Sequence, residues 1–223
     1  MEERELVHYL PIVTTVLAVP FATSLFRRYR ARGGKHHLWW GIGVACFGLG
    51  TLFESAITLN GNTPVTNKLW YVAGALLGAY PLAQGSAHLL MKERTVRVST
   101  WLTLPLVVVL SALVLASPTL ETQLETHRPG GAALGWAWVR YFTPFVNVYA
   151  VLILAGGAAV SAWRYVRARQ EPWKAAGNTL IMVGAILPAV GGGMAKAGAV
   201  EALYVAELLG LALIWAGYAC CVR

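Results

Sequence analysis

The chain has 223 residues, of which 57% are apolar and 13% are charged, and its mean hydropathy is +0.57. Soluble domains typically carry about 25% charged residues, so this composition excludes an ordinary soluble domain and indicates a membrane protein. The net charge of +8 does not indicate a nucleic-acid partner, because the basic residues are clustered between long apolar runs.

Seven apolar runs follow one another along the chain, with little sequence left for a soluble domain. A bilayer core of roughly 30 Å is crossed by about 20 apolar residues in a helix. Transmembrane strands would instead need alternating segments of about 10 residues, and these runs are apolar on all sides. The sequence therefore predicts an all-α integral membrane protein with seven transmembrane helices over 6–26, 38–59, 69–91, 98–117, 136–163, 177–195 and 202–221.

Basic residues mark the ends of alternate spans. Thirteen of the eighteen Lys and Arg residues follow the first, third, fifth or seventh span, and five lie on the other side. Because cytoplasmic loops carry an excess of Lys and Arg, we expect the N-terminus outside and the C-terminus in the cytoplasm. The acidic start, MEERE, agrees with a translocated N-terminus. These features predict a multi-pass protein of the cell membrane, with the lipid bilayer as a partner.

Two carboxylates lie inside the predicted spans, Glu54 in the second and Glu207 in the seventh. At a rise of roughly 1.5 Å per residue, Glu54 lies about 24 Å along its helix from the inner end, and Glu207 about 7.5 Å below the outer surface. A charged side chain at the bilayer centre costs roughly 2.5–3.5 kcal/mol, so such residues usually face the bundle interior or a wet cavity. We therefore expect both to line one cavity in the outer half. The alternative is a local structural role for each.

Besides the two carboxylates, other polar residues are predicted to lie inside the spans or near their ends. Gln84 and His88 in the third span carry less weight, because His88 is close to a basic loop and fits an interfacial position. The sequence has no HExxH, no CxxC and no in-span histidine pair, so we expect no metal and no cofactor. The candidate substrate-binding residues are Glu54, Asn147, Lys196, Tyr204 and Glu207.

The sixth span contains GAILPAVGGGMAKAG (184–198). Pro188 and the three following glycines should break or loosen this helix in its outer half. Broken helices at substrate depth occur in transporters. The alternative is that the small residues allow tight packing against a bulky neighbour such as Trp215.

Three short segments recur in the same order in both halves of the chain. VHYLP (7–11) resembles VRYFTP (139–144), FRRYRAR (26–32) resembles AWRYVRAR (162–169), and LWYVAGALLG (69–78) resembles ALYVAELLG (202–210). These matches predict a parallel duplication of three helices around a linker helix. The expected organisation is a single transmembrane domain with a first repeat over 1–95, the linker helix in 96–120 and a second repeat over 135–223.

A 3+1+3 arrangement of seven helices resembles the SWEET and PQ-loop facilitators, and its topology is similar to that of opsin-like proteins. The Pro-Gln signature of PQ-loop proteins is absent, and the second span has no proline. A retinal Schiff base needs a lysine in the last helix, and 202–221 has none. The chain is also loosely similar to the seven-helix sensor regions of bacterial kinases. The first resemblance implies a parallel-repeat bundle that moves a small solute.

Together these patterns predict a transporter or facilitator of a small polar or protonatable solute, which is the expected ligand besides the bilayer. The alternative is a seven-helix receptor or sensor that signals through a partner. A membrane-embedded enzyme ranks third, because no nucleophile–base pair is visible in the sequence. A homo-oligomer is compatible with all three functions.

Overall fold

The computed structural model describes residues 6–222, except for the side chain of Lys196, and this part of the chain is predominantly helical. Six helices are long and apolar enough to cross a membrane. Across 6–222, extended pairing is limited to an isolated bridge between Thr119 and Leu134. The all-α class is therefore confirmed, and the six apolar helices support a multi-pass membrane protein. The count of seven spans, the orientation and the duplication stay predictions.

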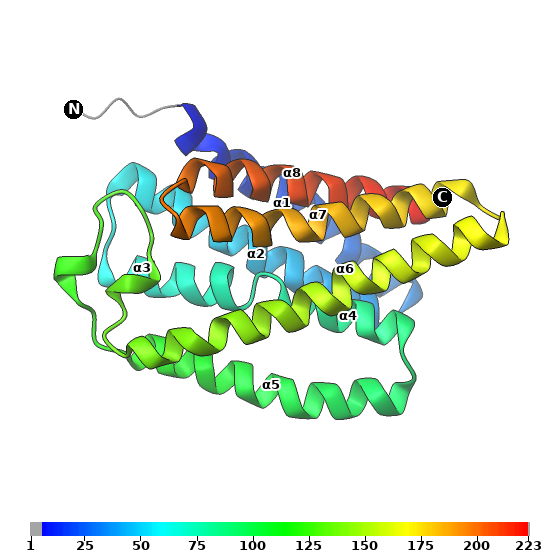
Figure 1. Cartoon of the computed structure of the whole chain (residues 1–223), viewed down its shortest axis with the longest axis horizontal. Helices are drawn as coiled ribbons and strands as arrows, with labels where there is room; N and C mark the ends of the chain where they lie inside the picture. The colour runs from blue at the N-terminus through cyan, green and yellow to red at the C-terminus, as the bar shows by residue number, and fades with distance from the viewer. Residues whose placement is uncertain (1–5, 223) are drawn as a thin grey trace. The chain divides into compact units, whose positions relative to one another are not determined.

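The helices follow the predicted spans closely (Figure 1). The first predicted span corresponds to η1 and α1, the second to α2, the fourth to α5, and the last three to η5 with α6, α7 and α8. The elements are η1 (Leu6–Tyr9), α1 (Leu10–Arg32), α2 (Lys35–Asn60), α3 (Pro64–Trp70), η2 (Tyr71–Leu76, π-helical), α4 (Tyr80–Leu90), α5 (Glu93–Ala116), η3 (Glu121–Gln123), η4 (Gly131–Ala133), η5 (Ala137–Phe142), α6 (Thr143–Ala168), α7 (Pro172–Lys196) and α8 (Val200–Cys221).

The third predicted span, 69–91, is interrupted, so the prediction of one continuous helix there was wrong. The chain leaves α3 through the π-helical η2, residues 77–79 are not helical, and α4 begins at Tyr80. Figure 1 shows this break as an irregular turn before α4. Pro81 provides the physical reason, because it has no N–H to donate to the carbonyl of Leu77 and its ring would clash with that carbonyl in a regular helix. We call residues 64–90 the third segment.

The chain forms two compact units. The central unit is Ala18–Ala150, and the terminal unit combines Met1–Leu17 with Val151–Arg223. These boundaries differ from those of the predicted repeats, but compactness does not test whether a sequence is duplicated. The core of the central unit is an apolar cluster contributed by η2, α4, α5, η5, α6 and the loop before η5, and it consists of Tyr71, Leu76, Tyr80, Val107, Leu110, Val114, Leu134, Val139 and Val146.

In the central unit, α2 packs against the third segment at very short range. A Cβ atom added to Gly50 would fall 2.6 Å from the Cα of Gly74, so Gly50 has no room for a side chain. Further along, the Trp40 indole N–H donates to the Ser86 hydroxyl at 3.2 Å. Small residues allow helix backbones to approach closely. The Gly50–Gly74 contact lies before the break and the Trp40–Ser86 bond after it, so α2 holds the third segment on both sides of the break.

In the terminal unit, α7 and α8 form an antiparallel hairpin with backbones in contact. The predicted break at Pro188 and its glycines is not present, because α7 is continuous from Pro172 to Lys196. The alternative of close packing through small residues fits Gly191, where a Cβ would fall 2.7 Å from the Cβ of Ala206. Pro188 cannot donate to the Gly184 carbonyl four residues earlier. That carbonyl lies against α8, where a Cβ on Gly210 would fall 2.7 Å from its oxygen and 2.9 Å from the Pro188 ring. The proline is therefore accommodated by a glycine on the neighbouring helix.

Candidate functional site

The third segment carries polar side chains on the side that contacts α5, α6 and the loop before α6. They are Asn67, Tyr71, Tyr80, Gln84 and His88. The steps within α3–η2 and within α4 are four residues, which keeps side chains on one helical face, but Tyr71 and Tyr80 are nine residues apart. In a regular helix, a spacing of seven or eight residues would keep them on one face. The π-helical turn and the break absorb the extra residue, so the interruption keeps the two halves of this polar face in line.

Gln84 is the centre of the buried part of this face, with a side chain that is 0% exposed. Its Nε2 lies 3.1 Å from the Tyr80 hydroxyl, 3.0 Å from Thr103 Oγ1 and 3.1 Å from the Tyr149 hydroxyl. Its Oε1 accepts from Thr100 Oγ1 at 3.0 Å. Tyr149 also contacts the Ser99 hydroxyl at 2.8 Å. We call Tyr80, Gln84, Ser99, Thr100, Thr103 and Tyr149 the Gln84 network.

The hydrogen atoms in this network have a consistent arrangement. Thr103 donates its hydroxyl hydrogen to the Ser99 carbonyl at 2.8 Å, so the Tyr80 hydroxyl must donate in its 2.9 Å contact with Thr103 Oγ1. Tyr80 and Thr103 are then acceptors for the Gln84 amide. An amide has two N–H donors, which are shared here among three oxygens. The hydroxyls thus determine which way the Gln84 amide is oriented.

Near the break, α6 supplies polar partners to the third segment. Asn147 Nδ2 donates to the carbonyl of Ala75 at 3.2 Å, in the last turn before the break. One turn earlier on α6, the Thr143 hydroxyl lies 2.8 Å from the Tyr71 hydroxyl. Backbone groups released by a break must find partners inside the protein when no water can reach them. Asn147 performs this role for the Ala75 carbonyl.

At the far end of the third segment, Asn67 binds the connection between α5 and α6. Its side chain is 1% exposed, and it accepts from the Gly130 N–H and donates to the Gly130 carbonyl, both at 2.9 Å. Asn62 Nδ2 donates to Asn67 Oδ1 at 3.2 Å and to the Arg128 carbonyl at 3.0 Å. These bonds close the loop over this end of the polar face.

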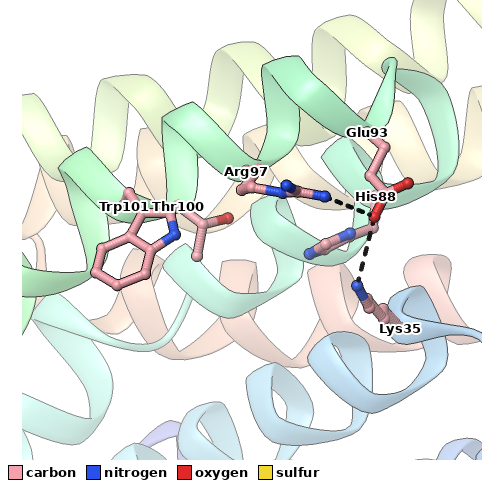
Figure 2. Close-up of a pocket in the computed structure, with 6 residues that line it drawn as sticks. All are labelled: Lys35, His88, Glu93, Arg97, Thr100 and Trp101. Atoms are coloured by element: carbon pink, nitrogen blue, oxygen red, sulfur yellow. Dashed lines mark hydrogen bonds and ion pairs between the residues drawn. The ribbon is translucent and has the colours of Figure 1, made fainter.

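The opposite end opens into a pocket between α2, α4 and α5 (Figure 2). Its volume is about 210 Å³. Thr100 lines this pocket and also donates to Gln84, so the Gln84 network begins directly behind the pocket wall. Trp39 stacks on the His88 ring, with centroids 6.4 Å apart, and also contacts the Tyr80 ring edge-on. The lining residues are Lys35, His88, Glu93, Arg97, Thr100 and Trp101.

The candidate residues predicted from the sequence are divided between the two units. Glu54 is on α2 in the central unit and is 1% exposed, and Asn147 is on α6 in the same unit. Tyr204 and Glu207 are on α8 in the terminal unit, where Tyr204 is 0% exposed and Glu207 is half-buried. Lys196 ends α7, and its side chain lies outside the described part of the chain. The cavity shared by Glu54 and Glu207 stays a prediction.

At the start of α8, Tyr204 and Glu201 contact the segment before α1. The Tyr204 ring meets the His8 ring edge-on, with centroids 6.0 Å apart, and His8 Nε2 lies 3.8 Å from Glu201 Oε1. All three residues belong to the terminal unit. The buried Tyr204 is therefore part of a contact between α8 and the segment before α1. Its role as a substrate-binding residue stays a prediction.

The Gln84 network was largely missed at the sequence level. Tyr80, Gln84 and His88 are spaced by four residues within an apolar run, and this spacing was the available signal. Thr100, Thr103 and Tyr149 had no such signal, because isolated hydroxyls occur in many transmembrane helices and commonly bond to their own helix.

No protein-family model matches the sequence, and comparisons with curated proteins and with solved structures also find no match. The resemblance to SWEET and PQ-loop facilitators therefore stays a prediction from topology. The function is inferred from the arrangement of polar residues in the chain itself.

Proposed function

We propose that the protein is a multi-pass transporter or facilitator of a small polar or protonatable solute. The observation that carries this proposal is the interrupted third segment, in which polar side chains occur both before and after the break. Irregular backbone at membrane depth is tolerated where it is buried in protein or lines a water-filled cavity. In transporters such interruptions form the solute site.

The chemistry of the polar face suits a small solute with hydroxyl or amide groups. The Gln84 network joins an amide to five hydroxyls through bonds of 2.8–3.1 Å, and each hydroxyl can both donate and accept. A solute that carries such groups can replace these bonds one at a time, so a polar solute would not have to cross bare hydrocarbon. Asn147 offers the same kind of exchange near the break.

The protonatable side of the proposal rests on Glu54 and Glu207. Glu54 is buried on α2, the helix that packs against the third segment. Intramembrane carboxylates are rare and usually belong to ion or proton pathways. We propose that these two residues line the outer half of the solute path, with the C-terminus and the clusters of basic residues in the cytoplasm.

Transport can be tested with the purified full chain in liposomes. The liposomes are loaded with buffer and mixed with glycerol, a hexose or an amino acid, and solute entry is followed by light scattering as they re-swell. We expect faster entry of at least one solute than in protein-free liposomes, and slower entry for Asn147→Leu. Ser111→Ala is the matched control, because the Ser111 hydroxyl donates to the Val107 carbonyl of its own helix. Entry equal to that of empty liposomes for every solute would favour a receptor instead.

The two carboxylates are tested by Glu54→Gln and Glu207→Gln in the same liposomes. The neutral amide is cheaper to bury than a carboxylate, so both variants should fold. Only the carboxylate can titrate, so we expect each substitution to reduce the pH dependence of solute entry. Wild-type entry rates at every pH in both variants would contradict their place on the solute path.

A further inference from the structure

The pocket between α2, α4 and α5 carries a charge pattern that the proposed transport does not use. Glu93 Oε1 lies 3.3 Å from Arg97 Nη2 and 3.9 Å from Lys35 Nζ. Figure 2 shows both cations directed at this one carboxylate from different helices, with His88 beside them. Two permanent positive charges therefore face a single negative charge, and the pocket has an excess of positive charge.

These ion pairs leave the cations available to another anion. The side chains of Lys35, Glu93 and Arg97 are 68%, 71% and 67% exposed. Exposed ion pairs contribute little to stability, because solvent screens them and the side chains stay mobile. A guanidinium can also bind carboxylate or phosphate oxygens through two parallel N–H donors. An incoming phosphate group can thus compete with Glu93 for both cations.

One wall of the pocket continues into an apolar surface on α5. Trp101 lines the pocket and is 75% exposed, and Leu102 beside it is 69% exposed. Further along α5, Val108 and Val109 are 59% and 54% exposed. Exposed tryptophan is typical of the interface between headgroups and hydrocarbon. An exposed Trp101 at this end of α5 suits the level of lipid headgroups, and the exposed apolar face beyond it suits acyl chains.

We propose that this pocket binds the phosphate of an anionic phospholipid, with Lys35 and Arg97 as the phosphate ligands and Trp101 beside the glycerol region. Basic pockets between transmembrane helices are suited to such headgroups. The volume of about 210 Å³ suits a small headgroup rather than a drug-sized ligand, which needs roughly 300–1,000 Å³. When the lipid is absent, Glu93 pairs with Lys35 and Arg97, and this competition lowers the affinity of the pocket for the lipid phosphate. This proposal does not depend on transport.

The test uses the purified full chain in micelles, titrated with phosphatidylglycerol or phosphatidylcholine, with bound lipid counted by native mass spectrometry. A Lys or Arg near the membrane surface contributes about 1 kcal/mol to anionic lipid binding, which corresponds to about fivefold in the dissociation constant. We expect Lys35→Gln and Arg97→Gln each to weaken phosphatidylglycerol binding about fivefold. Glu93→Gln should strengthen it by a similar factor, because it removes the competing carboxylate.

Arg94→Gln is the matched control, because Arg94 is at the same end of α5 but does not line the pocket. We expect it to leave the dissociation constant within about twofold of the wild type, because Arg94 is no phosphate ligand in this proposal and its longer-range attraction to the headgroup is screened by salt. Equal losses in Arg94→Gln and Arg97→Gln, or weaker binding in Glu93→Gln, would overturn the site. Binding of phosphatidylcholine as tight as that of phosphatidylglycerol would overturn the anionic phospholipid as the ligand of this pocket. So would a rise in melting temperature with inorganic phosphate that equals the rise with phosphatidylglycerol.

Discussion

Replacing Gln84 with methionine keeps the length of the side chain and removes its amide. The Gln84 amide supplies two hydrogens to the Tyr80, Thr103 and Tyr149 oxygens and accepts one from Thr100. Three simultaneous hydrogen bonds are therefore lost. Side-chain hydrogen bonds in membrane proteins contribute about 0.6 kcal/mol each on average, so we expect Gln84→Met to lower the free energy of unfolding by about 2 kcal/mol.

The remaining hydroxyls limit this loss. Tyr80 keeps its bond to Thr103, and Tyr149 keeps its bond to Ser99, because neither contact involves Gln84. Thr100 alone loses the acceptor of its hydroxyl hydrogen. Thr100→Val, which removes one bond from the same network, should therefore lower the free energy of unfolding by only about 0.6 kcal/mol.

The assay is reversible unfolding of the purified protein in mixed micelles with increasing denaturing detergent, followed by tryptophan fluorescence. The single variants and the double variant Gln84→Met/Thr100→Val form a double-mutant cycle. Because both single variants remove the same Thr100–Gln84 bond, the double variant should be more stable than the sum of the single effects predicts. Fully additive effects, or a Gln84→Met variant as stable as the wild type, would refute the network.

Three further predictions concern packing, the loop after α5 and the orientation. Gly210→Val places a side chain against the α7 backbone and should lower the free energy of unfolding by about 1–3 kcal/mol, whereas Gly192→Val, with open space around it, should leave the melting temperature almost unchanged. Asn67→Ala removes the bonds to Gly130, so faster proteolysis within 119–131 is expected, and unchanged cleavage would contradict this role. Single cysteines in 164–174 should resist labelling from outside intact cells, and external labelling would reverse the predicted orientation.

Local composition predicted the approximate limits of the six long apolar helices, because the length of a hydrophobic run depends only on adjacent residues. The predicted second span, 38–59, lies within α2 (Lys35–Asn60), and 202–221 lies within α8 (Val200–Cys221). The distribution of Lys and Arg likewise predicts an orientation without any knowledge of packing. The burial of Glu54 followed from the same local reasoning and is confirmed, since its side chain is 1% exposed.

Tertiary structure decided what each proline does. Pro81 and Pro188 both lie in apolar runs next to small residues, yet the third segment is broken before Pro81 and α7 continues through Pro188. A proline always removes one helical hydrogen bond, but whether the helix breaks depends on the neighbours of the freed carbonyl. For Pro188 the freed carbonyl is that of Gly184. It lies against Gly210, which is on another helix and 22 residues after Pro188 in the sequence.

The Gln84 network also depended on tertiary structure. Apart from Tyr80, the side chains that bond directly to Gln84 are 16 to 65 residues away from it, so no short window of sequence brings them together. Their contact requires the π-helical turn to shift the face of α4 by one residue and α5 and α6 to present hydroxyls at the matching height. Hydrogen bonds need donor and acceptor within about 3 Å and in line. That condition is met only once separate helices have packed in a particular register.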